Sequence, residues 1–303
     1  SLSAEDLRAV PADAVFASVA RFDLGQIERM LDEMAEHGME IDEFFEEFED
    51  ETGVDIRRDI LQGIGGTGVF YMADSTGGGN LMSSVLMMTY KNRDRFLEAH
   101  GKLMRLANGA LEDNDEVGKY VRLTPWKHGD VELISLRFRG LPIPLELSYA
   151  ATDKWFVAGL TPQAVIAAVQ QARGGGDAGL GSVPEVAAIV KAKGSVSSVS
   201  YMDAARLGRS GYWMVSLGGS AIANAMRSPG GDRDPGLVVP TYRALMKGAR
   251  PTVDIGYWNG STFAYESHGD RSLLVQGAIA GGLVTQFAPG VAAVIGRAAA
   301  ASR

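Results

Sequence analysis

The side chains best suited to acid–base or metal chemistry in this sequence are four histidines that lie far apart in the chain. They are His37, His100, His128 and His268. No two are three or four residues apart, as zinc ligands on one helix face would be, and the motif H-E-x-x-H is absent. His100 falls in an apolar helical stripe, where we expect a hydrogen-bonded packing residue rather than a general base. Each of the others precedes a glycine, which is typical of a turn.

Three glycines match the spacing of a dinucleotide-binding loop. Gly63, Gly65 and Gly68 fit G-x-G-x-x-G, a motif that needs a strand before it and a helix after it. Here a helical pattern precedes the glycines and the strand that starts near Gly68 follows them. This order opposes nucleotide binding.

Acidic side chains suggest two incomplete calcium sites. Asp113, Asn114, Asp115 and Gly118 resemble the start of a calcium loop, but Val117 and Thr124 stand where ligands are needed. Asp232 and Asp234 form an equally incomplete pair. We therefore predict no catalytic, cofactor-binding or metal-binding residue and no cofactor. This favours a non-enzymatic protein, although an enzyme with scattered catalytic residues stays open.

A dense acidic cluster surrounds an aromatic stripe in residues 41–51. Phe44, Phe45 and Phe48 repeat at helical spacing, and most residues around them are glutamate or aspartate. One interpretation is a cation site or a docking surface for a basic partner. The favoured interpretation is an amphipathic helix with a buried aromatic face and a solvated acidic face.

The composition limits the classes of protein. The chain has 303 residues, 46% of them hydrophobic and 22% charged, which is normal for a folded protein and argues against long disorder. It has no cysteine, so disulfides and thiolate zinc sites are excluded. The net charge is −8, and no stretch is densely basic. We therefore predict no nucleic-acid partner.

A strand–turn–strand–helix unit in residues 145–173 organises the rest of the chain. Leu145, Leu147 and Tyr149 alternate with polar residues as in a half-buried strand, and Trp155 begins the returning strand. Thr161 and Pro162 then start a helix. The same order of elements is predicted in residues 68–107 and from residue 253 to the C-terminal end.

Capping residues place most of the other elements. A strand in residues 14–22 is followed by helices that begin after Asp23 and after Asn92, and the second helix is expected to stop at Asn108-Gly109. A short helix is expected in residues 55–62. Asn259-Gly260 predicts a tight hairpin.

These elements predict an α+β fold. We expect mostly antiparallel sheets with helices packed on one face, built from repeated hairpin-helix units in two related lobes. The glycine-rich segment 174–181 is the candidate boundary, with a first lobe of residues 1–176 and a second of residues 177–303.

The C-terminal segment from residue 272 to 296 carries no charge and is flanked by Arg271 and Arg297. Its length would span a bilayer, but glutamines, glycines and a Pro-Gly pair interrupt it. We expect a core helix or a subunit contact, with a membrane-surface contact as the alternative.

Three segments resemble an uncharacterised family of exported bacterial proteins. They are V-P-A-D-A (Val10–Ala14), D-E-T-G-V-D-I-R-R-D-I-L (Asp50–Leu61) and the hairpin-helix Asp153–Arg173. The resemblance implies an extracytoplasmic location, with a signal peptide removed before Ser1, and a non-enzymatic role. It implies no catalytic positions.

We therefore expect an exported structural or protein-interaction module that binds a protein partner or self-associates. One alternative is a carrier that holds an apolar ligand between sheet and helices. That alternative is suggested by Met82, Met87, Met88 and Met104, although methionine also fills irregular cores. The other alternative is an enzyme without a recognisable motif.

Overall fold

The computed structural model describes residues 1–37, 41–114, 117–140, 146–176, 178–227, 236 and 238–270. The strands are β1 (Ala14–Arg21), β2 (Ile64–Ala73), β3 (Ser84–Tyr90), β4 (Val121–His128), β5 (Val131–Phe138), β6 (Ser148–Ala151), β7 (Trp155–Gly159), β8 (Ser198–Met202), β9 (Thr252–Trp258) and β10 (Phe263–His268). The α-helices are α1 (Ala4–Arg8), α2 (Leu24–Glu36), α3 (Ile41–Thr52), α4 (Arg93–Glu112), α5 (Pro162–Ala172), α6 (Pro184–Lys193), α7 (Ala204–Met226) and α8 (Tyr242–Leu245). Three short helices complete the set: η1 (Ile56–Leu61), η2 (Leu81–Ser83) and η3 (Leu180–Ser182).

All ten strands form one sheet in the order β10-β9-β8-β1-β2-β3-β7-β6-β5-β4. The pairs from β1 through β2, β3, β7, β6 and β5 to β4 are antiparallel. The predicted α+β class with mostly antiparallel strands is confirmed. Two predicted hairpin-helix units are present as β6-β7-α5 and β2-β3-α4.

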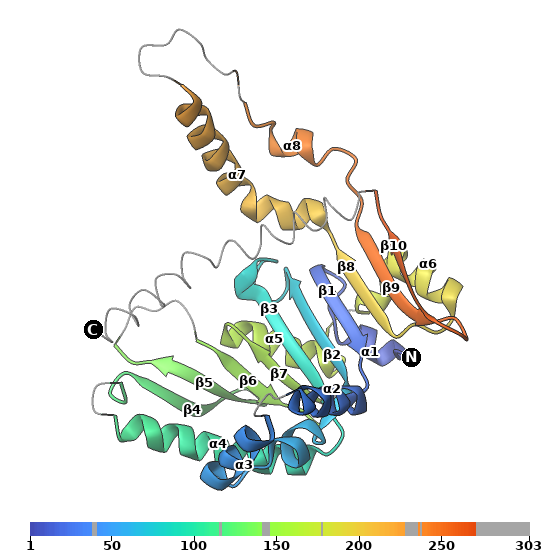
Figure 1. Ribbon diagram of the computed structural model, residues 1–303. Helices are drawn as coiled ribbons and strands as arrows, with labels where there is room; N and C mark the ends of the chain where they lie inside the picture. Colours follow the sequence, from blue (N-terminus) through green and yellow to red (C-terminus); the bar gives the residue numbers. More distant parts are fainter. Residues whose placement is uncertain are drawn as a thin grey trace. The chain divides into compact units, whose positions relative to one another are not determined.

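Helices cover both faces of this sheet (Figure 1). On one face, α5 packs so closely on β7 that a Cβ atom added at Gly159 would lie 3.1 Å from a methyl of Val165. On the other face, the Phe96 ring of α4 meets the Phe156 ring of β7 at a centroid distance of 5.5 Å. The sequence pattern predicted helices on one face only. The pattern shows which residues of a strand are apolar, but it does not show to which side each helix returns.

The main core lies on the face that α5 covers. Val69, Tyr71, Val85, Met87 and Trp155 are at most 2% exposed. Four apolar residues of α5 are also fully buried: Ala164, Val165, Ala168 and Val169. Side chains along each strand alternate between this face and a second face that is less covered.

The end of the glycine-rich segment 174–181 packs against the residues near Val10. Leu180 is fully buried, and its backbone N–H donates to the carbonyl of Val10 at 2.8 Å. The chain divides into one compact unit of residues 1–201 and 254–266 and another of residues 202–253 with residues from 267 on. The sheet belongs almost entirely to the first unit, and α7 and α8 belong to the second. The division of the chain at residue 176 into two related lobes stays a prediction.

The order β8, α7, α8, β9, β10 parallels the order β1, α2 and α3, η1, β2, β3. The predicted helix at residues 273–300, and with it the membrane or subunit contact of residues 272–296, lies outside the described residues. Within the described part of the chain, no helix combines the length and apolarity needed to cross a membrane.

Candidate functional site

A cavity of about 540 Å³ lies between α4 and the strands β4 to β7. Its wall is formed by Arg93, Leu97 and His100 of α4, Pro125, Trp126 and Lys127 of β4, Glu132, Leu133 and Ile134 of β5, Tyr149, Ala150 and Ala151 of β6 and Phe156 of β7. Most of these side chains are apolar or aromatic. Small-molecule sites in proteins have this size and character, with a few polar groups that fix orientation.

Helix α4, which covers the cavity, is hydrogen-bonded to residues of the sheet or next to it near both of its ends. At its start, Asn92 caps α4 by accepting from the Arg95 N–H at 3.1 Å, and Arg93 Nε donates to the carbonyl of Thr152 at 3.0 Å. Near its end, the Asn108 side chain donates to the Leu123 carbonyl and accepts from the Leu123 N–H, both at 3.1 Å. These bonds fix the position of α4 against the strands that line the cavity.

The same asparagine explains one wrong prediction. Asn108-Gly109 was expected to stop the helix, but α4 continues to Glu112. Asn108 bonds the neighbouring β4 backbone, so its side chain does not compete for the backbone of its own helix.

Two polar side chains meet inside this mostly apolar cavity. His100 Nε2 and Tyr149 Oη lie 2.7 Å apart, and the rings meet edge to face with centroids at 5.0 Å. Burial lowers the pKa of His100 and raises the pKa of Tyr149 to about 12. Near neutral pH the pair is therefore uncharged, and it can offer a hydrogen bond to a ligand. The prediction that His100 is a hydrogen-bonded packing residue agrees with this contact.

The charged side chains of the cavity wall are all at least one third exposed. Lys127 and Glu132 form an ion pair at 3.0 Å, with side chains 60% and 81% exposed. Arg93 lies beside Asp94 at 3.7 Å. Such exposed pairs contribute little to stability.

The histidine makes stability depend on pH. Unfolded histidine has a pKa near 6.5, and the folded value is lower, so the unfolded chain takes up a proton first as pH falls. The contribution of His100 to stability is complete above about pH 6.5 and is lost as pH falls through its folded pKa. We expect the melting temperature of wild type to fall relative to that of His100→Gln as the pH is lowered from 7.5 to 5. A pH-independent difference would contradict this. His128→Gln, at an exposed histidine, is the control.

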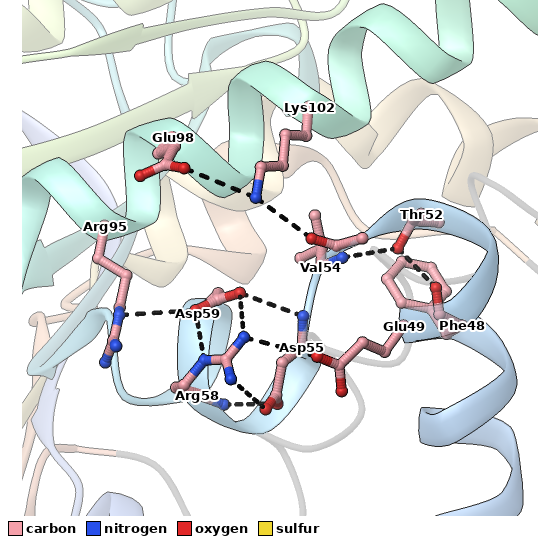
Figure 2. A network of polar contacts seen from close by, with 11 residues as sticks. Phe48, Glu49, Thr52, Val54, Asp55, Arg58, Asp59, Arg95, Glu98 and Lys102 are labelled. Atoms are coloured by element: carbon pink, nitrogen blue, oxygen red, sulfur yellow. Dashed lines mark hydrogen bonds and ion pairs between the residues drawn. The ribbon is translucent and has the colours of Figure 1, made fainter.

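A second cavity, of about 500 Å³, is lined mainly by charged residues of η1 and α4. Figure 2 shows that five of these residues belong to a network of polar contacts: Arg58, Asp59, Arg95, Glu98 and Lys102. Asp59 accepts from Arg58 Nε at 3.0 Å and from the Asp55 N–H at 3.2 Å, and Arg95 lies 3.5 Å from it. The hydrogen bond from Arg58 lowers the pKa of Asp59. Lys102 donates to the Gly53 carbonyl at 3.3 Å and pairs with Glu98 at 3.6 Å.

This network joins the end of α3 to η1 and α4, and η1 lies within the segment Asp50–Leu61. Each charge in it has an opposite charge or a carbonyl within 3.6 Å. The network therefore positions η1 and the end of α3 against α4. Because its charges have this structural role, the apolar cavity is the better candidate for ligand binding.

The aromatic face of α3 is less buried than predicted. No residue of this helix is buried, and Phe44 is 56% exposed. Phe44 touches Phe45 and Phe48, and Arg57 stacks over Phe45 at 5.3 Å. The prediction is wrong because α3 packs on α2, η1 and α4 instead of the sheet. The aromatic stripe gives the side of α3 that faces its neighbours, but not how much of that side they cover.

Part of the acidic cluster is paired with arginine. Arg57 bonds Asp42 at 2.8 Å and Asp32 at 2.6 Å, and Arg58 lies 3.5 Å from Glu49. Within the described ranges, no three histidine, aspartate or glutamate side chains are grouped to hold a metal. Asp115, Asp232 and Asp234 lie outside the described residues.

The glycine motif has a packing role. A Cβ atom at Gly65 would lie 2.3 Å from Thr89 Oγ1, and one at Gly68 would lie 2.9 Å from the Phe22 ring. Both glycines belong to β2 and not to a loop before a helix. His37, His128 and His268 lie at element ends, as expected of residues near turns.

The sequence suggested methionines for an apolar ligand site, but none of them lines the cavity. Met87 is fully buried on the opposite face of β3. Comparisons of the chain with protein-family models, with curated proteins and with solved structures each found no match.

Proposed function

We propose that the protein is a non-enzymatic binding module that holds a small ligand with an apolar body between α4 and β4 to β7. The cavity of about 540 Å³ carries this proposal. Its aromatic wall offers apolar contact, the His100–Tyr149 pair offers a hydrogen bond, and Arg93 and Lys127 offer positive charge. A medium-chain carboxylate has the matching chemistry, and decanoate is a suitable probe.

The proposal includes an extracytoplasmic location. Its support is the resemblance carried by Val10–Ala14, Asp50–Leu61 and Asp153–Arg173, together with a chain that has no cysteine to mispair during export.

Filling the cavity should abolish binding. Leu97 lies on the inner side of α4, and Leu97→Trp places an indole where the ligand would sit. We expect decanoate affinity, measured by isothermal titration calorimetry, to fall at least about tenfold, equivalent to about 1.4 kcal/mol. The control is Leu106→Trp on the same helix, at a residue 44% exposed and outside the cavity. Equal affinity of wild type and Leu97→Trp would contradict the proposal, as would absence of binding to wild type.

A second candidate function, self-association, is favoured by α7. Trp213, Leu217, Ile222 and Met226 are each more than half exposed on this helix. Trp213 and Leu217 lie one turn apart on one side, and Ile222 and Met226 lie one turn apart on nearly the opposite side. No charged residue separates Arg209 from Arg227. The side that carries Trp213 and Leu217 suits the same side of a second copy, because a two-fold interface pairs a patch with itself.

Self-association is testable by sedimentation velocity. We expect a discrete dimer for the full chain at micromolar concentration, and a monomer for the double variant Trp213→Ser with Leu217→Ser. Leu106→Ser, which removes a similarly exposed leucine elsewhere, should leave the dimer intact. A monomeric wild type would contradict this function.

A further inference from the structure

An apolar strip crosses the open face of the sheet and begins at the cavity wall. Directly paired residues on neighbouring strands point to the same face. Tyr149 of the cavity pairs with Ala158, Ala158 with Leu86, and Leu86 with Phe70. The row therefore runs without a break from β6 through β7 and β3 to β2.

Among the described residues, the strip is only partly covered in the middle of the sheet. Leu86 is 44% exposed and Phe70 is 37% exposed, whereas Val85 and Val69 beside them are at most 1% exposed on the other face. Phe16 of β1 extends the strip, because its ring meets that of Phe70 at 5.9 Å. Large apolar side chains at the centre of a sheet are normally covered, and a continuous exposed patch marks a binding surface.

The strip is long enough to hold part of an extended hydrocarbon chain. Strands lie about 4.8 Å apart, so the three steps from β6 to β2 span about 14 Å, and the two steps from β7 to β2, about 10 Å, lie beyond the cavity. No charged residue takes part in the row of pairs from Tyr149 to Phe70. The surface thus suits an unbranched hydrocarbon chain that continues outward from the cavity.

Building on the proposed function, we propose that the ligand is a long-chain amphiphile. Its head and first methylenes occupy the cavity beside His100 and Tyr149, and the rest of its chain lies along Ala158, Leu86 and Phe70. The cavity then determines whether a carboxylate amphiphile binds, and the strip selects for chain length.

The experiment compares octanoate, dodecanoate and hexadecanoate, each below its micellar concentration, in calorimetric titrations of the full chain. A fully buried methylene is worth about fourfold in affinity, and a half-covered strip gives less. We expect hexadecanoate to bind at least about tenfold more tightly than octanoate. Leu86→Ser should remove most of this gain while leaving octanoate affinity unchanged. Leu106→Ser, with the same 44% exposure, should behave as wild type.

The outcomes separate the two proposals. If octanoate binds but chain length has no effect, or if Leu86→Ser weakens all three ligands equally, the strip does not hold the chain and only this inference fails. If no carboxylate binds, the proposed function fails with it. A dimer that Leu86→Ser converts to monomer without ligand would show that a second copy covers the strip, which also overturns the inference. Melting curves of the variants verify that the fold is retained.

Discussion

Replacing Trp155 with alanine is expected to lower the free energy of unfolding by about 3–5 kcal/mol, the usual loss for a buried aromatic residue. Trp155 is 2% exposed on the face of β7 that α5 covers. Its backbone N–H donates to Thr152 Oγ1 at 2.8 Å, so the strand geometry around it is well fixed and cannot easily collapse into the space left. Urea unfolding followed by far-ultraviolet circular dichroism measures the change.

The matched control is Trp258→Ala at the end of β9. Trp258 is 64% exposed, so its removal should change stability by no more than about 0.5 kcal/mol. Similar losses for both variants would show that the α5 face is not the main core of the first unit.

Replacing Gly179 with alanine is expected to cost about 2–5 kcal/mol. Gly179 has a φ of +77°, which is strained for any residue with a Cβ atom. A Cβ atom there would also lie 2.5 Å from the Cα of Arg8 and 2.8 Å from its carbonyl oxygen, so backbone would have to move. Chemical unfolding would record a lower midpoint with little change in slope.

Gly174→Ala is the control in the same glycine-rich segment. Gly174 has a φ of +82°, and no atom lies within 4 Å of its added Cβ. This variant should lose only the backbone strain, about 1–2 kcal/mol. If the two variants lose equal stability, the connection is not packed against residues 8–10, and the segment behaves as the exposed linker that its composition suggests.

Local signals predicted the elements well because their physics is local. Asp23, Asn92 and Thr161 each cap the helix predicted after them, since a cap needs only a side-chain oxygen and the next turn of backbone. The predicted hairpin between β9 and β10 is present, but its connection comprises residues 259–262, with Asn259 accepting from the Thr262 N–H at 2.9 Å. Helix α6 was not predicted: it has no side-chain cap, and only Pro184 in its first turn indicates a helix start.

The sequence predicted only part of the candidate site. The apolar stripe around His100 predicted a packed histidine, but its partner Tyr149 is 49 residues away. Leu97 and Phe156 are ordinary core residues in sequence, and only the pairing of four strands beneath α4 makes them a cavity wall. The methionines drew attention because of their type, yet residue type does not determine on which face of the sheet a side chain lies.

The sequence by itself determined the α+β class, two of the predicted hairpin-helix units and several helix starts, because alternation, caps and turns act within a few residues. Only the tertiary structure decided the order of the ten strands, the separation of α4 and α5 onto opposite faces, and the exposure of Phe44, Phe70 and Leu86. These depend on contacts between segments far apart in the chain. An apolar pattern shows that a surface can be buried, whereas the neighbours that reach it decide whether it becomes core, cavity or open strip.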